Sequence, residues 1–250
     1  MSQKYKRIKE YLIQFLREET FKTGLNGGVM VLDHSVDSAV TAILAKEAFG
    51  NRLLLLISQK DTEDAPLKSF CEKRDIRYFT IVEDEITKSI AILEEADSSR
   101  REAFASRVRM AILYDIASRE RALVLGSMNK SALLLGEGTI YGDLACALNP
   151  VGDLYRSEVR EFAAYLGVSD FFDGLNVLDN SEAFDNLLKA FVEERLSREE
   201  LIARGYESEV VDTVIDRIYR NQFKHKLPLV AKLTSRTVGQ NLRYPRDIKL

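Results

Sequence analysis

Apolar and polar positions change period along the chain, and these changes predict helices that alternate with buried strands. Apolar residues at helical spacing predict a helix over residues 5–19. Continuous apolar runs predict buried strands at residues 29–32 and 53–57, and a third strand is expected at residues 77–82. Because helical segments lie between them, this order predicts a parallel sheet wound by right-handed crossovers.

The second half of the chain adds one strand, at residues 123–125, and several helices. Three glycines, Gly136, Gly138 and Gly142, mark tight turns or a close approach of the backbone to another group. Helices are expected over residues 86–93, 98–118, 157–166, 181–196, 197–204 and 208–222, and the tail from residue 228 shows no clear period and is expected on the surface. These elements predict an α/β fold with a doubly wound, mostly parallel sheet flanked by helices. A helical C-terminal part completes a single domain over residues 1–250.

Composition narrows the class of protein. Of the 250 residues, 46% are hydrophobic and 30% are charged, which is typical of a soluble globular protein. A net charge of −3 provides no broad basic surface, so we expect no nucleic-acid partner. The two cysteines, Cys71 and Cys146, and the two histidines, His34 and His225, lack the spacing of a structural zinc site. The charged first residues and the absence of a long apolar run lead us to expect a cytoplasmic protein without a membrane partner.

The stretch from Gly27 to Val40 has the order of a buried strand, a polar turn and a helix start. Asp37 and Ser38 lie at or near the start of the expected helix, where unpaired N–H groups and a partial positive charge suit an anion. This order indicates phosphate binding at the carboxyl end of a parallel sheet. The alternative is an ordinary turn in which both side chains only cap the helix. The stretch by itself allows both interpretations.

Three segments of the chain resemble ammonia-dependent NAD synthetases. The run GSMNKSALLLGEGTIYGDLACALNPVGDLYRSEV at residues 126–159 matches the core of that family, and SRVRMAILYD at 106–115 and RTVGQNLRYPRD at 236–247 match it too. The resemblance implies the ATP-pyrophosphatase fold, which is Rossmann-like and adenine nucleotide alpha hydrolase-like. It also implies a homodimer, with the helix from Ser98 to Ser118 at the interface. The family reaction uses ATP and Mg²⁺ to activate the carboxylate of deamido-NAD, and ammonia then gives NAD, AMP and pyrophosphate.

The resemblance assigns the phosphate loop to residues 33–38, where the family has Ser-Gly-Gly-x-Asp-Ser. The implied ATP-binding residues here are Asp33, His34, Ser35, Val36, Asp37 and Ser38. Only the end of the motif is kept. Asp33 is expected to place a carboxylate near the pyrophosphate oxygens, a repulsion of about 4 kcal/mol per pair of unit charges. His34 and Ser35 add side chains where backbone should approach the phosphates, although His34 could supply a compensating cation.

Further positions carry over from the same resemblance. Asp37 matches a magnesium ligand, whereas Ala132 stands where the family has a second, glutamate ligand. Ser127 replaces an ATP-binding threonine, and Arg156 replaces a lysine that meets the phosphates.

The implied deamido-NAD contacts are Arg109, His225 and Lys226, with Arg107, Asn129 and Lys130 on the same side. Each has an ordinary interpretation as well, since charged helix residues are usually solvated and His225 can be a surface histidine. The segment at residues 176–185 and the short loop at 58–62 depart from the family pattern, and Ala103 replaces an asparagine.

Two functions follow from this mixture of kept and altered positions. The first is a working NAD synthetase with an altered nucleotide site. The second is a catalytically inactive homologue that acts as a binding or structural homodimer, because the departures gather at the ATP and magnesium positions. An ATP-pyrophosphatase with another substrate is a third possibility. The altered phosphate loop predicts a compromised ATP site, and the sequence leaves open whether the chain is an active enzyme.

Overall fold

The computed structural model describes residues 2–59, 64–82, 97–168, 181–225 and 230–238. Within them the centre of the molecule is a parallel sheet of four strands in the order β3-β2-β1-β4. The strands are β1 (Gly27–Leu32), β2 (Leu53–Gln59), β3 (Arg77–Val82) and β4 (Ala122–Val124). In β1, Val29 pairs with Leu54 of β2 and with Val124 of β4. The expected parallel sheet is therefore confirmed, and the predicted strand ends are within two residues of those observed.

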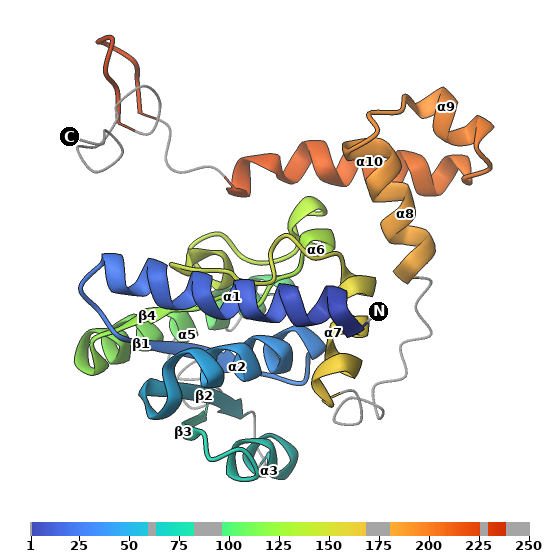
Figure 1. Cartoon of the computed structure of the whole chain (residues 1–250). Helices are drawn as coiled ribbons and strands as arrows, with labels where there is room; N and C mark the ends of the chain where they lie inside the picture. The colour runs from blue at the N-terminus through green and yellow to red at the C-terminus, as the bar shows by residue number, and fades with distance from the viewer. Residues whose placement is uncertain (1, 60–63, 83–96, 169–180, 226–229, 239–250) are drawn as a thin grey trace.

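Helices cover both faces of this sheet (Figure 1), as a doubly wound fold requires. One face carries α1 (Ser2–Lys22), α2 (Val36–Phe49), α3 (Ala65–Glu72) and α7 (Arg156–Leu166), and the other carries α5 (Ser98–Glu120). Successive side chains of β1 point to opposite faces of the sheet and so pack in different layers. Met30 and Leu32 pack with the first group, whereas Val29 packs against α5. Cys71 lies in the first layer as a buried free thiol.

The strand order places a topological switch point between β1 and β4. The chain steps outward from β1 to β2 and β3, and then returns to the other side of β1 as β4. The strand order reverses at this point, and the crevice outside the carboxyl ends of the strands at such a point is where open α/β sheets bind ligands. The turn at residues 33–35 and the stretch at residues 125–129 begin at this point.

The C-terminal helices form an arm beside the α/β layers (Figure 1). It consists of α8 (Ser181–Val192), α9 (Arg198–Ala203) and α10 (Ser208–Asn221), followed by a short 3₁₀ turn, η5 (Gln222–His225). Apolar side chains of the arm pack on Leu135 and Tyr155, close to the short helix α6 (Lys130–Leu134). Two further 3₁₀ turns are η1 (Gly50–Arg52) and η3 (Asp143–Ala145). The expected C-terminal helices are confirmed, although α8 ends at Val192 and not at residue 196.

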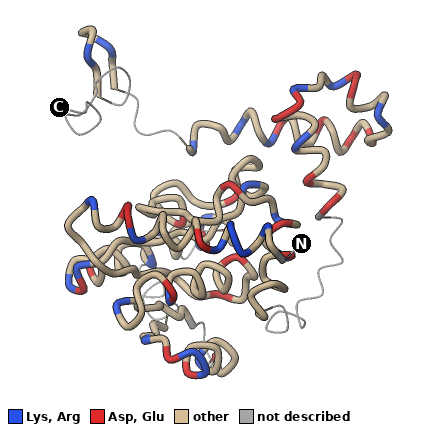
Figure 2. Tube along the Cα trace, viewed as in Figure 1, with Lys and Arg blue, Asp and Glu red and all other residues tan. Residues whose placement is uncertain are grey.

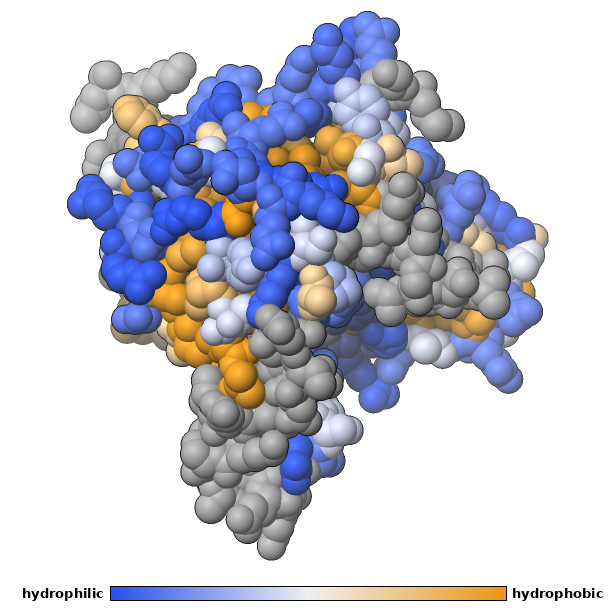
Figure 3. Space-filling model, turned by 90° about the horizontal axis from the view of Figure 1, so that it is seen from below, coloured by the Kyte–Doolittle hydropathy of each residue, from blue (hydrophilic) through white to orange (hydrophobic). Residues whose placement is uncertain are grey.

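The surface matches the composition. Positive and negative residues are interspersed over the described helices (Figure 2), and the face seen from below carries apolar patches among hydrophilic residues (Figure 3). Among the described residues, no helix combines the length and the apolarity needed to cross a membrane. Residues 230–238 are irregular and mostly exposed, as expected for the tail. The expected helix at residues 86–93, as well as Lys226, lies outside the described residues.

Candidate active site

The turn after β1 is held by its own side chains. Ser35 caps α2, since its hydroxyl oxygen accepts a hydrogen bond from the Ser38 N–H at 3.1 Å. The Asp33 carboxylate accepts hydrogen bonds from the N–H of Ser35 at 2.9 Å and from its hydroxyl at 2.5 Å. The interpretation of Asp37 and Ser38 as caps is therefore wrong, because Ser35 fills that role and Asp37 lies in the first turn. Asp33, whose carboxylate we expected to repel phosphate, accepts hydrogen bonds from within the turn.

Asp37 joins the carboxyl ends of β1 and β4. The Asn129 side-chain amide donates to its carboxylate at 2.9 Å, and the same side chain caps α6 by accepting from the Ala132 N–H at 2.9 Å. Burial raises the pKa of Asp37 to about 6, although the hydrogen bond from Asn129 and the positive charge of Arg156 favour its ionised form. A carboxylate with a raised pKa at the switch point of a parallel sheet is a strong candidate for a functional group.

The donor set for a metal ion is small. Ala132 is buried in α6 and offers no side-chain oxygen. Among the described residues, no group of three or more His, Cys, Asp or Glu side chains could hold a metal ion. Asp37 alone suits Mg²⁺ that arrives with the phosphates of a nucleotide and keeps several waters, which is the usual way in which Mg²⁺ is bound. The residues present therefore fit a nucleotide-bound Mg²⁺ and not a metal cage made by the protein.

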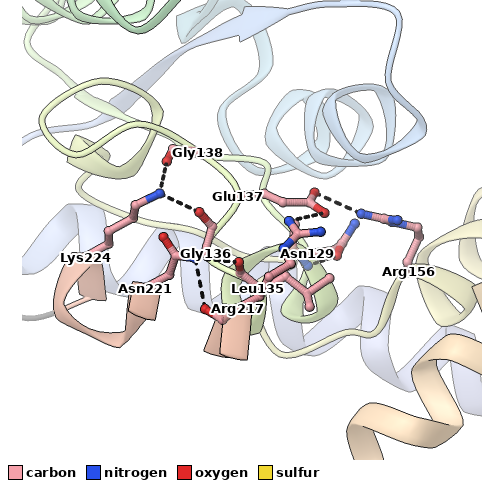
Figure 4. A network of polar contacts seen from close by, with 10 residues as sticks. Asn129, Leu135, Gly136, Glu137, Gly138, Arg156, Arg217, Asn221 and Lys224 are labelled. Carbon is pink, nitrogen blue, oxygen red and sulfur yellow. Dashed lines mark hydrogen bonds and ion pairs between the residues drawn. The ribbon is translucent and has the colours of Figure 1, made fainter. Parts of the chain in front are cut away.

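Arg156 begins α7 and is held at both its backbone and its side chain. Its N–H donates to the Ser131 hydroxyl at 2.9 Å, and its guanidinium contacts the Glu137 carboxylate at 3.0 Å (Figure 4). Glu137 lies in the glycine-rich stretch after α6 and also faces Arg217 of α10 at 3.6 Å. The cation that the resemblance assigns to the phosphates thus has a carboxylate partner that the sequence analysis missed.

A buried carboxylate from the arm completes this corner. Asp185 of α8 accepts a hydrogen bond from the Ser131 hydroxyl at 2.5 Å and another from the Ser157 N–H, at the start of α7, at 2.8 Å. Asp185 is 1% exposed, and its bond with Ser131 is fully buried. Sequence reasoning missed Asp185. One available signal was its place among the apolar positions of an otherwise amphipathic helix, three residues before the buried Leu188.

The His34 side chain reaches the start of α3, the helix that follows β2. Its Nε2 lies 2.6 Å from the carboxylate of Asp64, and Asp64 caps α3 by accepting from the Leu67 N–H at 3.2 Å. The imidazole therefore ties the turn after β1 to the helix that follows β2. The possible role of His34 as a cation near the phosphates stays a prediction.

The remaining candidates lie around the glycine-rich stretch. Arg107 of α5 donates to the Ile140 carbonyl at 3.2 Å, and the partly buried Arg109 lies on the same helix. His225 is exposed in η5, next to Lys224, whose ammonium donates to the Gly136 carbonyl at 2.7 Å. The stretch after α6 is therefore bordered by α5 on one side and η5 on the other.

Ser127 and Lys130 are the two remaining candidates that follow β4. Ser127 is partly buried just beyond β4. Lys130, which we expected near the dinucleotide, contacts Glu193 at 2.7 Å and Asp153 at 3.2 Å and lies over the Tyr155 ring. This lysine therefore links α6 to the arm.

Comparisons with known proteins agree with this geometry. A sequence model described as NAD synthase matches residues 8–171. The chain is 35% identical to the NH(3)-dependent NAD(+) synthetase of Chlorobaculum tepidum, over 97% of this chain and 95% of that protein. It is 37% identical to the enzyme of the same name from Wolinella succinogenes, over 90% and 95% of the two chains.

A solved structure gives the same result in three dimensions. It is the NH3-dependent NAD synthetase of Campylobacter jejuni in complex with the nitrate ion, with a TM-score of 0.81 and 30% identity. The match covers 91% of this chain and 99% of that one. These matches give no support to the alternative of an inactive homologue. The chain belongs to the NAD synthase family.

Proposed function

We propose that the chain is an active ammonia-dependent NAD synthetase that amidates deamido-NAD with Mg-ATP. NAD synthetases use ATP and Mg²⁺, and they are typically homodimers with nucleotide substrates. The observation that carries the proposal for this chain is the position of Asp37. It lies at the switch point, its pKa is raised to about 6, and it shares the site with Asn129 and Arg156. The altered turn still forms a helix start, with Ser35 as its cap.

In this proposal the α2 N-terminus and Arg156 hold the triphosphate, and Asp37 holds the Mg²⁺ that accompanies it. Mg²⁺ supplies neutralisation of the phosphate charge when it is bound. The deamido-NAD carboxylate forms a bond to the α-phosphorus, and the bond from that phosphorus to the pyrophosphate oxygen breaks. Arg156 stabilises the charge that develops on the departing pyrophosphate. Ammonia then bonds to the acyl carbon, AMP leaves with the electron pair of the broken C–O bond, and the nitrogen releases its extra proton.

The contacts with deamido-NAD and with a second subunit belong to the same proposal. Arg109, His225 and Lys226 are assigned to the dinucleotide, and Ser127 to ATP. The first two are supported by the position of α5 and η5 beside the glycine-rich stretch. α5 is assigned to the homodimer interface from the family resemblance. A cytoplasmic location stays a prediction from composition.

A coupled assay of NAD formation from deamido-NAD, ATP and ammonium tests the function. We expect turnover at ordinary enzyme rates, on the order of 1 per second or more, that requires both ATP and Mg²⁺. Asp37→Ala should reduce it at least about a hundredfold, because the carboxylate assigned to Mg²⁺ is removed. Asp216→Ala is the control, since Asp216 pairs with Arg220 on its own helix. Wild-type protein that forms no NAD while remaining folded would show that the proposal is wrong.

A further inference from the structure

Glu137 is shared between the candidate phosphate cation and the C-terminal arm. One carboxylate oxygen is 3.0 Å from the Arg156 guanidinium and the other is 3.6 Å from the Arg217 guanidinium (Figure 4). All three side chains are partly exposed, between 27% and 44%. The two arginines therefore come from different parts of the fold, one from the start of α7 and one from α10, and bind opposite sides of a single negative charge.

The backbone that carries Glu137 is positioned by α10. Gly136 has φ +67°, and a Cβ added there would lie 1.9 Å from the Asn221 Cβ. The Asn221 amide donates to the Leu135 carbonyl at 3.3 Å, and Lys224 donates to the Gly136 carbonyl at 2.7 Å. Side chain and backbone contacts together tie this stretch to the arm (Figure 4). The position of Glu137 thus depends on the docking of α10.

The Arg156 Nη2 group that contacts Glu137 is also a donor for a phosphate bound at this site. Guanidinium groups bind carboxylate and phosphate in similar bidentate geometry, so the two anions exclude each other at the shared N–H groups. The charge of Arg156 already acts on Asp37, which places this choice of partner at the nucleotide site. When Arg156 turns to phosphate, Arg217 remains as a partner for the released carboxylate.

We propose that Glu137 competes with the nucleotide phosphates for Arg156, and that Arg217 on α10 weakens this competition by holding Glu137. The arm thereby sets the affinity of the site for polyphosphate anions. This inference rests on the proposed function, because it requires phosphate binding at Arg156.

Isothermal titration with inorganic pyrophosphate, and separately with Mg-ATP, tests the competition. Glu137→Gln should bind pyrophosphate more tightly by about 1.5-fold to fivefold, the range that follows from one partly exposed ion pair. Arg217→Gln should bind about twofold more weakly, because Glu137 then turns wholly to Arg156. Arg220→Gln is the matched control, since Arg220 lies on the same helix but pairs with Asp216.

In a Glu137→Gln background, Arg217→Gln should not change the affinity for pyrophosphate any further, whereas a simple loss of positive charge would still weaken binding.

Whether Glu137→Gln raises or lowers the affinity for pyrophosphate shows whether Glu137 competes with phosphate for Arg156 or helps Arg156 to bind it. If Glu137 only supported Arg156, removing its charge would weaken pyrophosphate binding, and the inference would be overturned. Equal affinities for Arg217→Gln and Arg220→Gln would overturn it too, and this comparison decides the matter if Glu137→Gln does not fold. If neither wild-type protein nor Glu137→Gln binds pyrophosphate or Mg-ATP, the proposed function fails together with the inference. If the wild type binds and Glu137→Gln does not bind more tightly, the inference alone fails.

Discussion

Replacing Asp185 by asparagine should destabilise the protein without changing the volume of the side chain. Asp185→Asn keeps one carbonyl oxygen, which can still accept from the Ser157 N–H. Its new NH₂ group must then face the Ser131 hydroxyl, whose oxygen already accepts from the Arg156 N–H. The Ser131 hydroxyl proton consequently loses its acceptor inside the protein.

The loss in free energy of unfolding for Asp185→Asn can be worked out from the hydrogen bonds that change. Two charge-assisted hydrogen bonds become neutral ones, at about 1 kcal/mol between them, and a buried donor without a partner costs roughly 1–2 kcal/mol. The free energy of unfolding should therefore fall by about 2–3 kcal/mol, and the melting temperature by about 5–10 °C for a chain of this size. Asp185→Ala should cost more, because it removes both acceptors.

Urea unfolding followed by circular dichroism, together with calorimetric melting, measures the effect. Asp153→Asn is the control, since this carboxylate is 97% exposed and its loss should change stability by less than about 0.5 kcal/mol. Ser131→Ala should cost about 1–2 kcal/mol, and the double variant less than the sum of the single ones. If Asp185→Asn unfolds within about 0.5 kcal/mol of the wild type, the bonds of this corner contribute far less than we argue.

Three further predictions concern single residues. The pKa of Asp37 rises from 3.8 to about 6 on folding, so the folded protein without Mg²⁺ holds its proton more tightly and loses stability as pH rises between these values. Asp37→Asn should thus stabilise that protein by about 3 kcal/mol at pH 8 and very little at pH 4, and equal melting shifts at both pH values would contradict this. Gly136→Ala should lower the free energy of unfolding by about 2–4 kcal/mol, because the added Cβ meets Asn221. Gly167→Ala has a similar φ of +69° but no atom within 4 Å of the added Cβ, so it should lower this energy by only about 1–2 kcal/mol. Equal losses would mean that the Asn221 side chain moves aside at little cost. Asp64→Ala removes both the cap of α3 and the partner of His34. It should therefore lower stability by more than Asp97→Ala, which removes only the cap of α5, at a cost of about 1 kcal/mol. A double-mutant cycle of Asp64→Ala with His34→Ala should show coupling between the two residues.

The layers of the fold could be predicted because they depend on local periodicity. The continuous apolar runs became β1 and β2, and the helix expected over residues 197–204 is α9, which begins with a capping box formed by Ser197 and Glu200. The bond between Asp33 and Ser35 was also within reach of the sequence, since aspartate commonly accepts from the N–H two residues on.

The polar contacts of the site could not be predicted in this way. Glu137 and Arg217 are 80 positions apart, and Ser131 and Asp185 are 54 apart, so their meeting depends on how the arm docks. Periodicity reports which face of a helix is buried but does not identify the residue opposite a buried carboxylate. The resemblance assigned Arg156 to the phosphates, and only the structure showed that its guanidinium already has a carboxylate partner.

The distance in sequence between Asp185 and its partners affects how the protein is made. A ribosome delivers residues in order, so the sheet and α7 leave it before the arm does. Until α8 emerges, the Ser157 N–H at the start of α7 lacks the Asp185 carboxylate, and Leu135 and Tyr155 lack the apolar residues that cover them. A nascent or prematurely terminated chain can therefore hold a folded sheet while the corner around Arg156 is still incomplete. The last third of the chain to be synthesised completes the site.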